Sequence, residues 1–275
     1  MDWTDWIGRE QVQHDMLTPA LLARFRATFD SSETGDIAPQ GIHWCLCTPE
    51  AATHALDSDG HPRRGGFLPP IPLPRRMWAS STLSFHAPIA VGAAIARRSV
   101  IAGVQKKIGG SGPLVFVQLD HETTADGALV VREQQTLVYR EASTAAPAPL
   151  GSGAPALADH AWHREVTPSA PLLFRYSALT FNSHRIHYDA PYAIAEEGYR
   201  GIVVHGPLTA TLLLDLAARE LSANRLANFS FRGVSPAIAG EVLHLVGTVV
   251  DTLVTLTALG SDGREIMTAT AEIAR

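Results

Sequence analysis

The chain has 275 residues, 46% hydrophobic and 18% charged, a composition that suits one large or two smaller globular domains with a substantial core. Its net charge of −5, from 22 Lys and Arg and 27 Asp and Glu, excludes a generally basic surface for nucleic acid. No apolar run approaches the roughly 18 residues of a membrane span, and the acidic start MDWTDWIGRE is unlike a signal peptide. We therefore expect a cytoplasmic protein without nucleic-acid or membrane partners.

The N-terminal region contains one predicted helix and both cysteines. The helix spans residues 18–29, where Thr18 can cap the start, Pro19 fits the first turn and apolar residues follow at helical spacing. Cys45 and Cys47 stand two positions apart. Cysteines at this spacing rarely form a disulfide and make an incomplete zinc set, so we expect reduced thiols.

The two halves of the chain resemble each other in outline. Each half contains a proline followed four residues later by a glycine, then long β-branched segments, and ends in a hairpin with an Asp-Gly turn. Both residues of an Asp-Gly pair tolerate positive φ, which makes the pair a strong hairpin signal. The matching positions are Pro88 and Gly92 with Pro236 and Gly240, and Asp126-Gly127 with Asp262-Gly263.

A linker rich in Ala, Pro, Gly and Ser divides the chain near its middle, at residues 141–160. A second predicted helix, at 206–223, is apolar on nearly every side and should be buried. A buried helix followed by a long, curved antiparallel sheet is typical of the hot-dog fold. We therefore predict an α+β tandem (double) hot-dog fold, in which each half wraps a curved antiparallel sheet around a long helix. The predicted boundaries are 1–141, a linker at 142–160, and 161–275.

The stretch FNSHRIHYDAPYA, residues 181–193, concentrates polar side chains in an otherwise apolar region. Three interpretations compete: a metal site, an acid/base site, or histidines and helix caps with structural roles. Zinc needs three or four converging ligands, and the guanidinium of Arg185 between His184 and His187 disfavours a cation. Asn182 can also simply cap a turn. We expect no metal here, while a structural role stays open for each residue.

A second element, GIVVHGPLTA, delivers His205 and Gly206 to the start of the buried helix. Free N–H groups and the positive end of the helix dipole meet there, which favours a developing oxyanion. Gly206 also allows a ligand to approach the backbone closely. An imidazole base beside such an oxyanion site suits proton transfer next to a carbonyl group.

These two elements resemble the MaoC-like, or hydratase-2, dehydratases. The family motif reads Gly-Asp-x-Asn-Pro-apolar-His, and its histidine falls on His187. The second family element, apolar-His-Gly, falls on His205 and the glycine after it. This chain departs from the motif, since Asn182 stands at the aspartate, His184 at the asparagine and Arg185 at the proline.

Four segments point to a narrower group within this family. They resemble the two-domain mesaconyl-C4-CoA and itaconyl-CoA hydratases, which are similar to the type-2 hydroxyacyl-thioester dehydratases. The segments are PLPRRMWASSTLSFHAPI, VREQQTLVYR, FRYSALTFNSHRIHYD and GYRGIVVHGPLTATLL. The resemblance covers nearly the whole chain and implies a non-catalytic first half that helps to form the substrate pocket.

The resemblance implies a hydro-lyase that adds water reversibly to an enoyl-CoA, mesaconyl-C4-CoA or itaconyl-CoA, to give citramalyl-CoA. CoA is then part of the substrate, and no separate cofactor is expected. His187 is the expected base, because an imidazole titrates near neutral pH. Asn182 would orient water or substrate, and the N–H of Gly206 would hold the thioester oxygen.

The remaining polar residues receive binding roles. A dicarboxylic acyl group brings a free carboxylate, and Arg185 is expected to pair with it, with Arg75 and Arg76 as further candidates. His184 would line the substrate site or replace the motif asparagine structurally. The loop KKIGGSGP, residues 106–113, could contact a CoA phosphate, although such loops are more often turns.

Several alternatives stay open at this point. The chain could instead dehydrate straight-chain 3-hydroxyacyl thioesters, hydrolyse acyl-CoA as a hot-dog thioesterase, or bind acyl-CoA without catalysis. Its association into a homodimer is likewise undecided. The first half is expected to contain no catalytic base, because its histidines occur singly, at positions that include His43, His54, His86 and His121.

Overall fold

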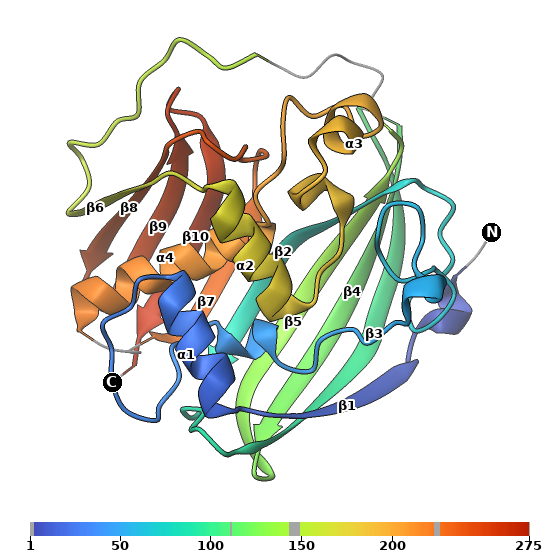
Figure 1. Cartoon of the computed structure of the whole chain (residues 1–275), viewed down its shortest axis with the longest axis horizontal. Coiled ribbons are helices and arrows are strands. Elements are labelled where there is room, and N and C mark those ends of the chain that lie inside the picture. Colours follow the sequence, from blue (N-terminus) through green and yellow to red (C-terminus); the bar gives the residue numbers. More distant parts are fainter. Residues whose placement is uncertain (1–2, 111, 143–148, 223–225, 275) are drawn as a thin grey trace.

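The computed structural model describes residues 3–110, 112–142, 149–222 and 226–274. They form one curved antiparallel sheet with the helices on its inner side (Figure 1). The first half contributes the strands β1 (Glu10–Met16), β2 (Arg75–Phe85), β3 (Ala94–Gly109), β4 (Gly112–Ala125) and β5 (Ala128–Arg140). The second half contributes β6 (Trp162–Val166), β7 (Leu226–Gly233), β8 (Leu243–Val250), β9 (Leu253–Gly260) and β10 (Glu265–Ile273).

The strand order repeats between the halves and reverses at their junction. It reads β1-β3-β4-β5-β2-β7-β10-β9-β8-β6, so β2 of one half pairs antiparallel with β7 of the other. Thr82 lies opposite Ser230 at the centre of this junction, and the Ser230 hydroxyl donates to Thr82 Oγ1 over 3.2 Å. The predicted internal repeat and tandem hot-dog fold are confirmed. The pairing also removes two exposed sheet edges.

The helices are less symmetric than the strands. They are α1 (Pro19–Thr28), α2 (Ala170–Thr180), α3 (Ala190–Ala195) and α4 (Gly206–Leu221), with 3-10 turns η1 (Thr4–Trp6), η2 (Ile42–Cys45), η3 (Thr53–Ala55) and η4 (Arg185–His187). α1 follows β1 as α2 follows β6, and both helices have a hydroxyl N-cap, Thr18 or Ser169. The predicted helix at 18–29 is therefore the counterpart of α2, not of α4.

Among the residues that the structure describes, only the second half supplies a long central helix, which corrects the expectation of one long helix in each half. α4 is buried along most of its length, as its apolar sequence predicts. The backbone of Gly41, with φ 100°, comes close to this helix, since a Cβ there would stand 3.3 Å from Leu214 Cδ1. The short turn η2 thus occupies space beside α4 that a second central helix would require.

One hydrophobic cluster spans both halves. It includes Leu83 of β2, Phe229 of β7 and Leu213 of α4, each with no exposed surface. Trp44 of η2 packs edge-on against Phe231 of β7, with ring centroids 5.9 Å apart. The boundary between the predicted domains therefore marks a repeat in topology, while the core is shared.

The predicted turns and linker are found between the expected strands. Asp126 and Gly127, with φ of 50° and 83°, form the tight β4–β5 turn. Residues 106–113 form the ends of β3 and β4 and the turn between them, in which Ser111 lies outside the described residues. The linker runs between β5 and β6, and its residues 143–148 also lie outside them, as does Ala223 of the second predicted helix.

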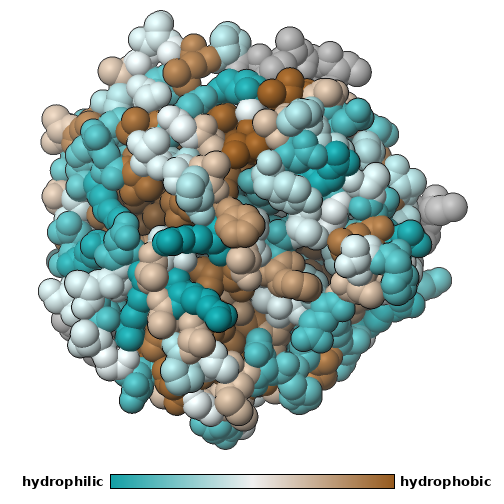
Figure 2. All heavy atoms as spheres, in the orientation of Figure 1, coloured by the Kyte–Doolittle hydropathy of each residue, from teal (hydrophilic) through white to brown (hydrophobic). Residues whose placement is uncertain are grey.

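The described part of the linker packs on the β9–β10 turn. The amide of Gly151 donates to Asp262 Oδ2 over 3.0 Å, and a Cβ on Gly263 would overlap the carbonyl of Ala154. Both cysteines are free, as predicted, and both are buried. Among the described residues, every helix is too short or too polar to cross a membrane. On the face that carries α1 and α2, apolar atoms are interspersed with polar ones (Figure 2).

Candidate active site

The chain reverses sharply between α2 and η4, and this turn brings the predicted histidines into the interior. Phe181 ends α2 in the left-handed region, with φ 48°. The side-chain oxygen of Asn182 then accepts the backbone N–H of His184 over 2.9 Å. Asn182 therefore stabilises the turn in this structure, as the capping interpretation predicted. Its proposed part in orienting water or substrate stays a prediction.

His187 is buried and held in one orientation. The residue is only 7% exposed, and its Nδ1 lies 2.7 Å from the carbonyl oxygen of Val203. A carbonyl oxygen only accepts, so Nδ1 carries the hydrogen and Nε2 is left with its lone pair. This geometry presents His187 as a hydrogen-bond acceptor or base through Nε2.

His205 stacks face to face on His187. The ring centroids are 3.5 Å apart and the planes are 18° from parallel. His205 Nε2 lies 2.8 Å from the Ser177 hydroxyl of α2, and His205 is the N-cap residue of α4. Gly206 follows in the first turn of α4, where backbone N–H groups have no partner within the helix. The second predicted element is thus beside the first.

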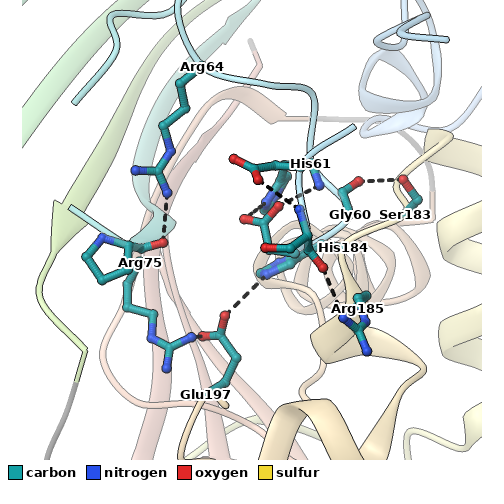
Figure 3. Close-up of polar contacts among 12 residues, drawn as sticks. Gly60, His61, Arg64, Arg75, Ser183, His184, Arg185 and Glu197 are labelled. Atoms are coloured by element: carbon teal, nitrogen blue, oxygen red, sulfur yellow. Dashed lines mark hydrogen bonds and ion pairs between the residues drawn. The ribbon is translucent and has the colours of Figure 1, made fainter. Parts of the chain in front are cut away.

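A loop of the first half reaches the same place (Figure 3). The ring of His61 lies 4.0 Å from that of His184, which stands edge-on to His187 at 5.4 Å. Asp59 holds His61 twice, since its Oδ2 is 3.0 Å from Nδ1 and its Oδ1 accepts the His61 amide over 2.8 Å. Four imidazoles from both halves therefore form one row, from His61 through His184 and His187 to His205.

The loop is joined to the second half through its backbone. Gly60 has φ 88°, and a Cβ at this position would overlap the carbonyl oxygen of Ser183. The Ser183 hydroxyl donates to the carbonyl of Gly60 over 2.6 Å, and the Arg185 amide donates to the carbonyl of Asp59 over 2.9 Å. Only glycine fits both the conformation and the space at this contact.

The guanidinium of Arg185 contacts protein groups. Its Nε and Nη2 donate to Asp189 Oδ2 over 3.0 and 2.8 Å, Nη1 donates to the Ser58 carbonyl over 3.0 Å, and the group lies 4.0 Å above the Tyr192 ring. Asp189 in turn caps α3 through the amide of Tyr192. Arg185 thus helps to fix the first-half loop. Its predicted contact with a substrate carboxylate stays a prediction.

A buried ion pair flanks the histidine row (Figure 3). Arg75 of β2 pairs with Glu197 and also donates to the Glu196 carbonyl. Glu197 Oε1 stands 4.0 Å from His184 Nε2. Arg64, from the first-half loop, donates to the backbone carbonyls of Ile71, Leu73 and Pro74. The Arg75 contacts hold β2 against the second half, and the Arg64 contacts hold the loop against the segment that leads into β2.

Burial keeps the histidine row neutral. Loss of hydration lowers the pKa of His187 to about 4, and the same cause lowers the pKa of His61, His184 and His205. Mutual repulsion within the row, and the charge of Arg76 near His61 and His184, lower these values further. Burial opposes ionisation of Asp59, but its hydrogen bonds to His61 and the histidine charges outweigh burial and lower its pKa.

One part of this row has donors that could hold a metal ion. Donor atoms of Asp59, His61 and His184 lie within 4.8 Å of one another. Asp59 already bonds His61, however, and the positive charge of Arg76 acts on both histidines. An added cation would meet that repulsion, so an acid/base site fits these residues better than a metal site.

Comparison with known proteins identifies the family of the chain. The profile of the hydroxyacyl-thioester dehydratase type 2 family matches residues 41–239. The mesaconyl-C(4)-CoA hydratase of Chloroflexus aurantiacus is 43% identical over 277 residues, which cover 99% of this chain and 98% of the relative. This chain belongs to the hydroxyacyl-thioester dehydratase type 2 family. As a member of this family it is a hydro-lyase.

Solved structures share the fold of this family member. A MaoC-like dehydratase superposes with a TM-score of 0.73 at 16% identity, over 98% of each chain. A conserved hypothetical protein of Mycobacterium tuberculosis, described as a double hotdog fold, gives a TM-score of 0.60 at 15% identity, over 98% of this chain and 97% of its own. At these identities the likeness concerns the fold alone.

In this dehydratase family member the two sequence motifs predict that His184, His187, His205 and Gly206 lie close together, as they do in the structure. The motifs do not include His61. The missed segment, DSDGH, contains an Asp-Gly pair and a histidine two residues after an aspartate. That spacing allows a short Asp–His contact, yet nothing in the sequence places the loop against residue 184.

The neutral row predicts that stability falls on acidification. Each histidine of the row has a folded-state pKa below its unfolded value near 6.5. Below pH 6.5 the unfolded chain therefore binds more protons than the folded chain and is favoured. Between pH 7 and pH 5 each fully neutral histidine should remove about 2 kcal/mol from the free energy of unfolding. Urea unfolding at both pH values measures this loss.

The matched pair of variants is His184→Gln and His86→Gln, because His86 is exposed on the surface. His184→Gln should reduce the acid-induced loss by about 2 kcal/mol, and His86→Gln should leave it unchanged. An equal loss in His184→Gln and in the parent protein would contradict the neutral state of His184.

Proposed function

We propose that this protein catalyses the reversible hydration of mesaconyl-C4-CoA to citramalyl-CoA. The observation that carries the proposal is the position of His187, whose unprotonated Nε2 lies in a buried row beside the start of α4. The 43% identity to a mesaconyl-C(4)-CoA hydratase over nearly the whole chain supports the substrate. Itaconyl-CoA, with the same atoms and a shifted double bond, is the second substrate to test.

The site suits the addition of water to a double bond conjugated with a thioester. His187 contacts the attacking water through Nε2, since Nδ1 is engaged by Val203. As the water oxygen bonds to the β-carbon, the electron pair of the double bond moves toward the thioester oxygen. The N–H of Gly206 at the start of α4 would stabilise that oxygen, and one such donor typically contributes about 3 kcal/mol. The water gives its proton to a neighbouring imidazole of the row, and the return of that proton to the α-carbon completes the addition.

The family description keeps a second substrate class in view. A type-2 dehydratase acting on straight-chain 3-hydroxyacyl thioesters would use the same groups in the reverse direction. An assay over mesaconyl-C4-, itaconyl- and crotonyl-CoA separates these substrates by loss of enoyl absorbance. Release of free CoA would instead indicate a thioesterase, and binding without either change would indicate a binding protein.

His187→Ala should lower kcat by about 10²–10⁴-fold, because the attacking water loses the imidazole that binds it at the site of proton transfer. The control is His86→Ala, which removes an exposed imidazole of the first half. Initial rates with mesaconyl-C4-CoA, together with circular dichroism to confirm folding, measure the effect. A folded His187→Ala variant with the parent kcat would refute the assignment of His187.

The free carboxylate of the acyl group needs a cationic partner, and the structure distinguishes three arginines. Arg75 is paired with Glu197 and Arg185 with Asp189. Arg76 follows Arg75 on β2, and after burial its charge further lowers the pKa of His61 and His184, to which it is therefore close. Within the described ranges Arg76 forms no ion pair with an acidic side chain. We therefore place Arg76 before Arg185 as the carboxylate partner.

Arg76→Met should cost the hydration of mesaconyl-C4-CoA about 2–5 kcal/mol in kcat/KM, because the substrate carboxylate is left unpaired. Crotonyl-CoA has no such carboxylate and should lose little. The comparison variant Arg185→Met should affect both substrates alike, since Arg185 holds the loop. If Arg185→Met alone showed the selective loss, Arg185 would be the carboxylate partner, as the sequence first suggested.

A further inference from the structure

The second half of the chain leaves the position of the motif aspartate without an acidic group. Asn182 stands there, and its side-chain oxygen accepts the backbone N–H of His184. Glu197 lies 4.0 Å from His184 Nε2, but its charge is paired with Arg75. Neither residue therefore offers an available carboxylate to a proton-transferring imidazole.

The first-half loop brings such a carboxylate together with an imidazole. Asp59 Oδ2 lies 3.0 Å from His61 Nδ1, and Asp59 Oδ1 accepts the amide of the same residue. An ionised carboxylate only accepts, so His61 Nδ1 carries the hydrogen and Nε2 keeps its lone pair. A proton taken up on Nε2 would form an imidazolium directly beside the negative charge of Asp59, which favours the charged ring.

The position of this pair is fixed by the backbone contact of Gly60 with Ser183. Asp59 and His61 are the neighbours of Gly60 in the chain. The contact that admits only glycine therefore also determines where these two residues lie. Asp59 is held a second time, because its carbonyl accepts the Arg185 amide. The pair is thus part of the second half's site in space, although about 120 residues separate them in sequence.

The pair also lies at the accessible end of the histidine row. The side chains of His61 and Asp59 are 20% and 17% exposed, whereas His187 is 7% exposed. His61 contacts His184 at 4.0 Å, and His184 adjoins His187. His61 can therefore exchange protons with solvent from a position one ring away from His187, which a residue confined to the core cannot do.

We propose that His61 is the proton-transferring group of this site, beside the water-binding His187, and that Asp59 is its positioning residue. The inference rests on the proposed hydration reaction, and it departs from the expectation that the first half supplies no base. His187 orients the water through Nε2, and His61 Nε2 takes the proton that the water loses as its oxygen bonds to the β-carbon. The electron pair of the double bond moves to the thioester oxygen.

The proton held by His61 then passes to the α-carbon, the enolate electrons re-form the carbonyl, and His61 returns to its neutral state. One water is consumed, and its oxygen and both of its hydrogens end in the product. Asp59 stays ionised throughout and compensates the imidazolium. The dehydration reaction follows the same steps in reverse, with His61 taking the proton next to the carbonyl.

The decisive variants are His61→Ala and Asp59→Asn, with His54→Ala as the matched control. His54 is exposed on η3 of the same first-half region and stands outside the row. With mesaconyl-C4-CoA we expect His61→Ala to lose 10²-fold or more in kcat with little change in KM, and His54→Ala to match the parent. Added imidazole should restore part of the activity of His61→Ala, which a purely structural loss would not allow.

Asp59→Asn provides a readout that packing alone would not move. His61 faces Asp59 and Arg64 from its own loop, Arg76 from β2 and the ring of His184. Removing the one negative charge in this set disfavours the imidazolium, so the acidic limb of the kcat/KM profile should move to lower pH as kcat falls. An unchanged limb in Asp59→Asn would overturn the positioning role of Asp59.

The remaining outcomes are distinguishable. If the parent protein hydrates no enoyl-CoA, the proposed function fails. If the parent hydrates and a folded His61→Ala variant keeps its kcat, only the role of His61 fails. If activity instead disappears on treatment with a chelator and returns with Zn²⁺ at one ion per chain, Asp59, His61 and His184 are metal ligands and the acid–base assignment is overturned.

Discussion

The antiparallel pairing of β2 with β7 is the contact on which the rest of the molecule depends. It joins two five-stranded half-sheets into one sheet and fixes the relative position of everything attached to these strands. The first-half loop enters β2 directly, and α4 precedes β7 closely in the chain. The pairing therefore brings the loop of one half against residues 183–185 of the other. A site made from both halves follows from this register.

The chemistry of the site depends on keeping positive charge low in a buried region. Four adjacent imidazoles at 3.5 to 5.4 Å avoid mutual repulsion while they are neutral, because several charged rings would repel one another strongly in a poorly hydrated space. The hydrogen bonds to Val203 and Asp59 select which nitrogen of His187 and of His61 is free. Burial thus keeps the rings neutral, and hydrogen bonding determines which ring nitrogen can accept a proton.

Much of this arrangement could be predicted from the sequence because its signals are local. The Asp126-Gly127 turn, the apolar helix α4 and the junction of His205 with Gly206 each depend on a few neighbouring residues. The position of His61 could not be predicted, since it depends on a contact between an irregular loop and residue 183. Arg185 and Asp189 stand four residues apart, a spacing at which the two side chains can form an ion pair. The expected dicarboxylic substrate favoured a contact between Arg185 and the substrate carboxylate instead.

The helices show where a repeat in sequence can mislead. The segments TPALLARF and APLLFRY are similar, and they form α1 and α2, which follow equivalent strands. The prediction of one long helix in each half instead implied that residues 18–29 would take the place that α4 takes in the second half. The distinction depends on burial: α4 is buried on nearly every side, while α1 buries only one face.

The fusion of two hot-dog units into one chain changes what substitutions can do. In a symmetric homodimer every residue occurs twice. A substitution that changes one side of a site therefore also changes the equivalent position of the partner. Here the loop with Gly60 exists once, and the segment that it contacts exists once. Each wall can therefore acquire residues that would be unfavourable on the other. The broken symmetry gives a single, asymmetric site whose two sides evolve independently.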